Sequence, residues 1–304
     1  MSPSEFPPAV YDAVVGEIGR RSGRSFHPSR AREIGGGCIH GAYVLESPAL
    51  RVFVKVNASA CAAMFAAEAA ALAALGGAGA LRVPAPLATG VAGAHAWLAL
   101  EFLALDERRQ DWARFGRGLA ALHRCRGEHY GWPHDNYIGT TPQPNGWMDN
   151  WPRFVRECRL GHQLALAAAS GYGGRLQSAG ARLLDGLDVF FRGYQPSPSL
   201  LHGDLWSGNA GFLAEGEPVI FDPAAYYGDR EAELAMTELF GGFPPAFYAA
   251  YEEAWATDAG YTVRRRLYRL YHLLNHLNLF GAGYLDRCQR ERCGRGSRRR
   301  GFAR

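Results

Sequence analysis

The stretch that decides the fold reads Leu201-His202-Gly203-Asp204-Leu205-Trp206-Ser207-Gly208-Asn209. A second stretch, Val219-Ile220-Phe221-Asp222-Pro223, places Asp222 thirteen residues after Asn209. Between them, residues 210–213 and the apolar run 219–221 flank a turn over Glu215-Gly216-Glu217. Two short apolar runs on either side of a glycine-containing turn predict a β-hairpin. The two ends of a hairpin lie together, so we expect Asn209 and Asp222 to be neighbours.

Three polar side chains in this region have the order and spacing of phosphoryl-transfer chemistry. Asp204 and Asn209 are five residues apart, as in the loop that carries the base and a metal ligand in phosphotransferases. Asn209 and Asp222 offer hard oxygen atoms that suit Mg²⁺. Asp204 then remains free to accept the proton of a substrate hydroxyl. The alternative is an ordinary turn rich in Asp, Asn and Gly.

Lys55 is the single lysine among 33 basic residues; the other 32 are arginine. It follows Val52-Phe53-Val54, so we expect a buried strand that carries one functional cation. Glu68 is the only acidic residue between Glu46 and Glu101, and it lies on a predicted helix over residues 62–75. A strand lysine followed by a helix glutamate is the pair that holds ATP phosphates in kinases. The alternatives are a lysine retained by chance and a solubilising surface glutamate.

A glycine-rich segment precedes this strand and contains Gly35, Gly36 and Gly37 followed by Cys38. Glycines allow the backbone to approach phosphates and to donate N–H groups to them. We interpret the segment as a phosphate-covering loop, although a plain turn has the same composition. Cys38 is a redox candidate because N–H groups that face anions also favour a thiolate. The alternative for Cys38 is a small residue that fills space.

Composition limits the class of protein. A chain of 304 residues with 48% hydrophobic and 20% charged residues is typical of a globular protein with one large domain or two lobes. Glu68 interrupts the longest apolar run, and the first residues lack an export signal, so we expect no membrane partner. Six scattered cysteines indicate thiols in a reducing cytoplasm. Eight arginines after residue 284 predict a basic, disordered tail, which is no evidence for a specific nucleic-acid partner.

The longer text around these motifs resembles the fructosamine kinase (ketosamine-3-kinase) family, whose fold is protein-kinase-like and related to the aminoglycoside phosphotransferases. The resemblance extends from about residue 8 to about residue 285. The matching segments are His202–Asn209, Ile220–Ala224, Tyr227–Glu231, Phe240–Phe243, Leu274–Asn278, Gly35–Ile39 and Phe53–Asn57.

The resemblance implies an α+β fold with two lobes. Residues 1–103 are expected to form a small nucleotide-binding lobe with an antiparallel sheet and one main helix. Residues 104–285 are expected to form a larger, mostly helical catalytic and substrate lobe, and residues 286–304 the tail. The backbone near Glu101 and Leu103 is then the hinge that binds adenine. We expect a monomer or a weak dimer.

The same resemblance implies ATP, Mg²⁺ and a ketosamine as the reactants, free or protein-bound. Phosphorylation of its sugar hydroxyl allows the phosphate to eliminate and the amine to be released, which is a deglycation repair. Trp206 is then a candidate to stack on the sugar, or else an anchor between the lobes, and His276 is a candidate for pocket hydrogen bonding. The alternatives are an aminoglycoside or choline kinase of the same fold and a non-catalytic nucleotide-binding regulator.

Overall fold

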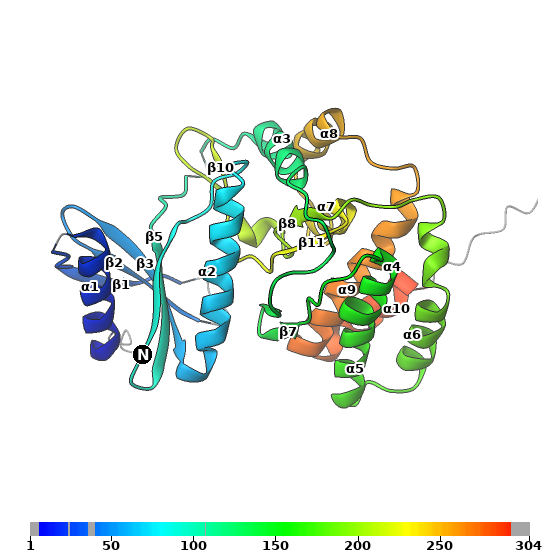
Figure 1. Ribbon diagram of the computed structural model, residues 1–304, viewed down its shortest axis with the longest axis horizontal. Helices are drawn as coiled ribbons and strands as arrows, with labels where there is room; N and C mark the ends of the chain where they lie inside the picture. The colour runs from blue at the N-terminus through cyan, green and yellow to red at the C-terminus, as the bar shows by residue number, and fades with distance from the viewer. Residues whose placement is uncertain (1–5, 24, 36–39, 107, 293–304) are drawn as a thin grey trace, which may run out of the picture.

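The chain forms two lobes that lie side by side (Figure 1). The computed structural model describes residues 6–23, 25–35, 40–106 and 108–292. The N-terminal lobe contains a sheet with one helix on each face, and the C-terminal lobe is mostly helical. The expected α+β architecture with a small sheet lobe and a larger helical lobe is confirmed.

The N-terminal lobe is built on a five-stranded antiparallel sheet with the order β1-β2-β3-β5-β4. Its strands are β1 (Arg30–Glu33), β2 (Gly41–Glu46), β3 (Arg51–Ala58), β4 (Pro86–Ala92) and β5 (His95–Glu101). In the central ladder, Lys55 of β3 pairs with Ala42 of β2 and with Leu98 of β5. The lysine therefore lies in the middle of the sheet.

Strand alternation decides which side chains face which helix, because successive side chains point to opposite faces. Val52, Val54 and Val56 pack beneath helix α1 (Pro8–Ser22). Residues at the intervening positions, Phe53 and Lys55, therefore face helix α2 (Ala62–Gly77) and the interlobe space.

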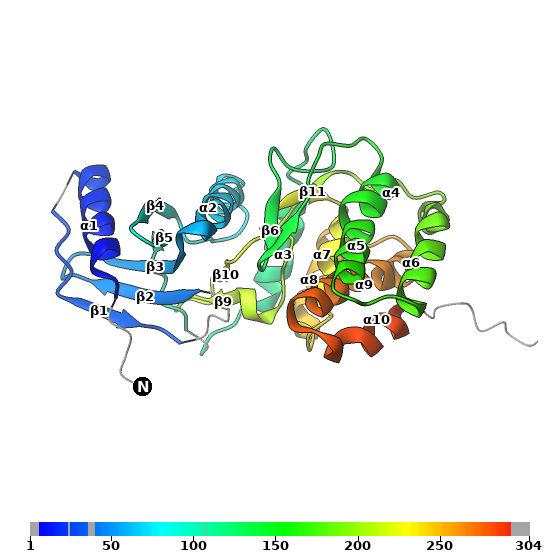
Figure 2. The same cartoon turned by 90° about the horizontal axis from the view of Figure 1, so that it is seen from below.

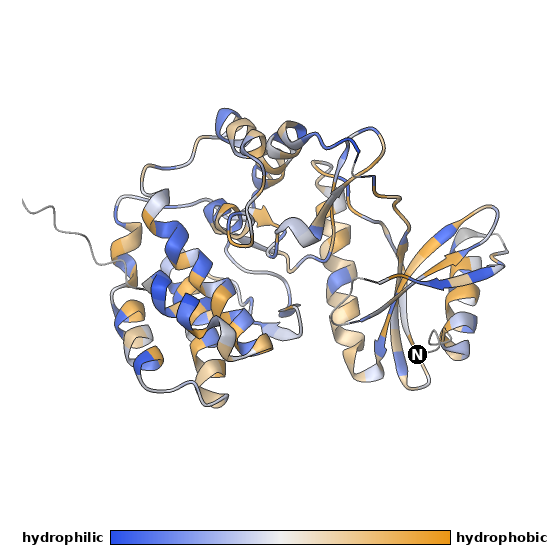
Figure 3. Ribbon diagram, turned by 180° about the vertical axis from the view of Figure 1, so that it is seen from behind, coloured by the Kyte–Doolittle hydropathy of each residue, from blue (hydrophilic) through white to orange (hydrophobic). Residues whose placement is uncertain are grey.

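Helix α2 is almost uniformly apolar (Figure 3). By length and composition alone the described stretch Ser59–Gly77 is long and apolar enough to cross a membrane, a test that the core helix of a globular protein also passes. It lies between the sheet and the C-terminal lobe (Figure 1). Its one charged residue, Glu68, forms an ion pair with Lys55 inside the protein.

The C-terminal lobe is mostly helical, and several of its helices pack against its longest helix, α9 (Tyr261–Phe280). Its helices are α3 (Trp112–His123), α4 (Trp151–Phe154), α5 (His162–Ala169), α6 (Arg175–Asp185), α7 (Arg230–Thr237), α8 (Pro245–Ala254), α9 (Tyr261–Phe280) and α10 (Leu285–Arg292). Its strands form three two-stranded pairs: β6 (Asn136–Ile138) with β7 (Thr141–Gln143), β8 (Ser199–Leu201) with β11 (Tyr226–Gly228), and β9 (Ala210–Phe212) with β10 (Pro218–Ile220).

The predicted hairpin is present as β9 and β10, between the sheet and the helical lobe (Figure 2). Its register pairs Ala210 with Ile220, so the residues just outside the hairpin are brought together. The backbone N–H of Phe221 donates to the carbonyl of Asn209 at 3.1 Å. This bond fixes Asn209 and Asp222 as neighbours.

Two elements differ from the sequence-based expectations. The region after residue 284 was expected to be disordered, but Leu285–Arg292 is helical and Cys288 is fully buried. The sequence did not reveal this helix because most of its residues are charged; in the structure Cys288 and Leu285 pack on the lobe, and Glu291 pairs with Arg266 and Arg269 of α9. The amphipathic pattern of residues 151–169 predicts one helix, but residues 155–161 within it form a π-helix. Periodicity alone does not reveal the extra residue in such a turn.

Candidate active site

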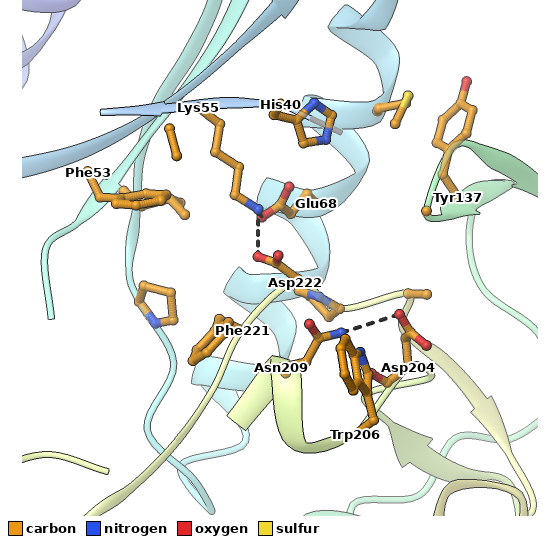
Figure 4. Close-up of a pocket in the computed structure, with 18 of the residues that line it drawn as sticks. His40, Phe53, Lys55, Glu68, Tyr137, Asp204, Trp206, Asn209, Phe221 and Asp222 are labelled. Atoms are coloured by element: carbon orange, nitrogen blue, oxygen red, sulfur yellow. Dashed lines mark hydrogen bonds and ion pairs between the residues drawn. The ribbon is translucent and has the colours of Figure 1, made fainter. Parts of the chain in front are cut away.

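A cavity of about 790 Å³ lies between the lobes and receives the side chains singled out in the sequence (Figure 4). The sheet and α2 form its upper wall, and loops of the C-terminal lobe form its lower wall. Lys55, Glu68, Asp204, Asn209 and Asp222 all line it. Residues 167 apart in the chain therefore meet in one place.

Lys55 binds two carboxylates at once. Its Nζ atom is 2.7 Å from Oε1 of Glu68 and 2.6 Å from Oδ1 of Asp222. Burial opposes its charge, but the two carboxylates outweigh this effect and raise the pKa of Lys55. The ammonium thus stays protonated and connects the two walls of the cavity.

The loop 202–209 is held by a buried carboxylate that the sequence did not reveal. Glu233 of α7 accepts the backbone N–H groups of His202 (2.7 Å) and Gly203 (2.8 Å). Burial favours the neutral acid, but the hydrogen bond from His123 and the loop's N–H groups lower the pKa of Glu233. Gly203 has a φ of +85°, and a Cβ atom there would lie 2.1 Å from the carbonyl oxygen of Ala224. The loop path therefore requires both the glycine and the carboxylate.

His202 supports this loop from below and is fully buried. Its Nε2 atom donates to the carbonyl of Phe221 at 2.9 Å, and its Nδ1 atom accepts the N–H of Asp204 at 3.3 Å. Burial lowers its pKa, which keeps the ring neutral. These contacts leave no ring nitrogen for proton transfer.

Asp204 is the carboxylate best placed to accept a proton. Burial, followed by the nearby charges of Asp222 and Glu233, raises its pKa to about 7. Asn209 opposes this shift by donating from Nδ2 to Oδ2 of Asp204 at 3.3 Å and to its carbonyl at 2.9 Å. A base with a pKa near neutrality is effective in proton transfer.

Asn209 and Asp222 fit a hard divalent cation. Because Nδ2 of Asn209 is committed to Asp204, the amide oxygen lies on the side of Asp222 (Figure 4). One carbonyl and one carboxylate oxygen are ligands that Mg²⁺ prefers. Asp222 has a φ of 58°, and it has the only positive φ of a non-glycine residue in the described chain. Such strain concentrates at functional positions.

The predicted hinge residues lie on the cavity wall at the end of β5. The carboxylate of Glu101 turns away and binds the Arg82 guanidinium and the backbone N–H of Ala85. The N–H of Glu101 also donates to the carbonyl of Ala85 at 2.9 Å. Leu103 follows on the cavity wall. Adenine can therefore be read by backbone groups beyond Glu101, and not by the Glu101 side chain or its N–H.

Several aromatic side chains line the end of the cavity away from the predicted hinge. The ring of Trp206 packs edge-on against Phe240, with centroids 6.0 Å apart, and 36% of the residue is exposed. The ring centroid of His276 lies 4.5 Å from that of Phe240, and the His276 ring also packs near those of Phe280 and Tyr284. Trp206 and His276 thus share one surface that could receive the acceptor.

Of the predicted glycine-rich segment, the structure describes Gly35 but not the three residues that follow it. Gly35 is exposed and lines the cavity. Gly36, Gly37 and Cys38 lie outside the described residues. Two cavity residues that were not assigned a role are His40 and Tyr137. In the sequence His40 follows a glycine-rich segment and Tyr137 lies in a stretch rich in turn-forming residues, so only their position in the structure marks them; Tyr137 lies on β6.

The fold of this chain is that of the kinase-type phosphotransferases. An aminoglycoside phosphotransferase, APH(4)-Ia, superposes with a TM-score of 0.61 at 15% identity, over 93% of this chain and 95% of that one, which shows the fold alone. A crystal structure from Haemophilus somnus, assigned as a fructosamine-3-kinase, gives 0.86 at 28% identity over 93% and 96%.

The chain belongs to the fructosamine kinase family, which matches residues 10–291. It is 45% identical to a probable ketoamine kinase of Synechocystis sp. over 93% of this chain and 95% of the relative. It is also 40% identical to the chloroplastic protein-ribulosamine 3-kinase of Arabidopsis thaliana, over 86% and 81%. The resemblance inferred from the sequence motifs is confirmed.

Proposed function

We propose that this kinase transfers the terminal phosphate of ATP to a sugar hydroxyl of ketosamines, free or protein-bound. The observation that carries the proposal is the contact of Lys55 with Asp222 in a cavity that Asp204 also lines. This contact joins the nucleotide side of the cavity to the acceptor side. Family membership supplies the substrate class, because relatives are named ketoamine and ribulosamine kinases.

The 3-hydroxyl is the acceptor that the name of the Arabidopsis relative specifies. Loss of a C1 proton from a 3-phosphorylated ketosamine gives an enaminol, in which the bond from C3 to the phosphate oxygen is allylic. That bond breaks, inorganic phosphate leaves with the electron pair, and hydrolysis of the resulting imine frees the amine. Phosphorylation at this position is therefore a deglycation step.

Asp204 is the catalytic base in this scheme. Its carboxylate accepts the proton of the sugar hydroxyl while the hydroxyl oxygen attacks the terminal phosphorus atom and ADP leaves. Lys55, oriented by Glu68, neutralises the phosphates from the N-terminal side. Gly35 lines the cavity on the phosphate side, and backbone groups around Leu103 bind adenine.

Asn209 and Asp222 would hold Mg²⁺, and the cation would supply positive charge beside the phosphates. Trp206 and His276 orient the acceptor sugar from the aromatic end of the cavity. In the described part of the chain Cys61, Cys125 and Cys158 are free thiols, in keeping with work in a reducing cytoplasm.

A screen for ATP consumption tests the proposal directly. Ribulosamines, fructosamines, an aminoglycoside and choline are offered to the wild type and to the Asp204→Asn variant. We expect turnover with ketosamines alone, abolished in the variant, together with a phosphorylated product in the mass spectrum. Turnover with the aminoglycoside or choline but not with ketosamines would replace the proposed substrate class.

A further inference from the structure

His40 immediately precedes β2 and lines the cavity above Lys55 and Asp222 (Figure 4). Its ring packs against Phe65 of α2, with ring centroids 4.9 Å apart. In the view of Figure 4 it lies on the side of Lys55 that faces Asp204 and Tyr137. The terminal phosphate must reach this part of the cavity, because the acceptor hydroxyl binds beside Asp204.

A hydrogen bond to Asn57 decides which ring nitrogen of His40 carries the proton. Oδ1 of Asn57 accepts the backbone N–H of Ala58 at 2.7 Å, and this contact orients the amide. Nδ2 of Asn57 is then the atom 2.7 Å from Nδ1 of His40. An NH₂ group only donates, so Nδ1 accepts and the neutral ring carries its proton on Nε2.

The ring is neutral under physiological conditions. Burial, followed by the charge of Lys55, lowers the pKa of His40 to about 4. A neutral imidazole with an Nε2–H group is a hydrogen-bond donor that adds no charge.

The cavity has few other donors for phosphate oxygens. Among the described residues that line it, Lys55 is the one cationic side chain, and none of the chain's arginines is present. A triphosphate carries several negative charges, and the transferred group carries charge spread over its three equatorial oxygens as the bond to ADP breaks. A preoriented neutral donor is effective in such a site.

We propose that His40 donates its Nε2–H to an oxygen of the terminal phosphate of ATP. This inference rests on the proposed function for the nucleotide and for the place of the acceptor hydroxyl beside Asp204, but not for the chemical identity of the acceptor. The contact requires the terminal phosphate, so it distinguishes ATP from ADP. It supplements Lys55 at the point of transfer.

Three substitutions at His40 separate this role from simple packing. In His40→Gln the amide nitrogen replaces Nε2, whereas in His40→Asn it replaces Nδ1 and stops short of the phosphate. His40→Ala removes both ring nitrogens. We expect the affinity for a non-hydrolysable ATP analogue, measured by calorimetry, to fall roughly 10- to 100-fold in the Ala and Asn variants. His40→Gln is expected to remain within about threefold of the wild type.

Binding of ADP is the internal control, because ADP lacks the terminal phosphate. We expect its dissociation constant to stay within about twofold of wild type in all three variants. His95→Gln, at the start of β5 and outside the cavity, controls for a histidine substitution in the same sheet. The proposal is overturned if Gln does no better than Ala, if Asn restores binding as well as Gln, or if ADP binding weakens in parallel. These binding measurements do not depend on the sugar, so failure of the ketosamine assay leaves them interpretable.

A spectroscopic measurement tests the tautomer by itself. Nitrogen-15 labelling of the ten histidines, with His40 assigned by comparison with His40→Gln, reports which ring nitrogen is protonated. We expect the Nε2–H form in the nucleotide-free protein at neutral pH. A proton on Nδ1 would overturn the proposal.

Discussion

The two walls of the cavity hold their functional groups by different means. On the N-terminal wall, Lys55 is oriented by ion pairs between side chains, which can exchange partners when a nucleotide binds. On the C-terminal wall, the loop 202–209 is held through its own backbone by the buried Glu233. The N-terminal wall, with Lys55, can therefore adapt to the nucleotide, and we call it the adaptable wall. The C-terminal wall, with the loop 202–209, is fixed before any ligand arrives, and we call it the fixed wall.

Asp222 is the connection between these two walls. It follows the β10 strand of the C-terminal lobe, yet its carboxylate binds the lysine of the N-terminal sheet. Half of its side chain is exposed to the cavity, whereas 8% of the Lys55 side chain is exposed. The comparison predicts that substitutions on the fixed wall affect turnover, and that those on the adaptable wall affect nucleotide binding as well.

The largest effect is expected from Asp204→Asn on the fixed wall. Removal of a general base lowers kcat typically ~10²–10⁴-fold. Binding of ATP should be unchanged because Lys55 and the metal ligands remain. Steady-state kinetics and calorimetry measure the two quantities, with Asp185→Asn, on an exposed part of α6, as the matched control. A kcat within about threefold of wild type would show that Asp204 is not the base.

Lys55→Arg tests the adaptable wall. The planar guanidinium cannot replace a compact ammonium between two carboxylates, although the charge is kept. We expect kcat/KM for ATP to fall about 10²-fold or more, with weaker ATP binding. Arg51→Lys, the reverse exchange at the exposed start of the same strand, should change neither quantity. Equal kinetics in Lys55→Arg and wild type would contradict the role of the lone lysine.

Glu233→Gln tests whether Glu233 holds the loop 202–209 in place. The amide accepts one of the two loop N–H groups and opposes the other with its own NH₂. We expect the free energy of unfolding to fall by about 1–3 kcal/mol and kcat by roughly tenfold because the loop shifts. The KM for ATP should change less than kcat. Denaturant titration measures the stability and steady-state kinetics the turnover, and Glu253→Gln, at an exposed position, is the control. If Glu233→Gln is as stable and active as wild type, Glu233 does not anchor the loop.

The smallest effect concerns acid stability of the C-terminal lobe. Burial, then the charges of His276 and Arg159, lowers the pKa of His272 to about 3. Between about pH 6.5 and pH 3 the unfolded chain binds a proton here that the folded chain does not, so stability falls as pH falls. His272→Gln should reduce the pH slope of the unfolding free energy by up to about 1.4 kcal/mol per pH unit. Exposed His27→Gln should leave the slope unchanged; an unchanged slope in His272→Gln would contradict the assignment.

Local patterns predicted much of this fold. The apolar run around Val219 and the glycine turn predicted the hairpin that joins Asn209 to Asp222, and the apolar strand around Lys55 predicted a buried lysine. The pairing of Lys55 with Glu68 also followed from their order on a strand and a helix.

Other features depend on contacts that no local pattern encodes. Glu233 lies in the polar run Asp229–Glu233, where a buried anchor and a surface acid look alike. The position of His40 beside Asn57 depends on the register between β2 and β3. The last helix, α10, is hydrophilic except for residues such as Cys288 that pack on the lobe. Each of these residues is defined by a partner distant in sequence.

The solitary lysine has a consequence for the survival of the protein itself. Sugars attach to lysine side chains through the neutral amine, and this chain has one such side chain, buried and held as an ammonium by two carboxylates. Arginine provides the remaining cationic side chains without offering an amine to aldoses. A kinase proposed to reverse the sugar modification of amines thus presents almost no lysine target for the same damage, and its nucleotide site protects the one it has.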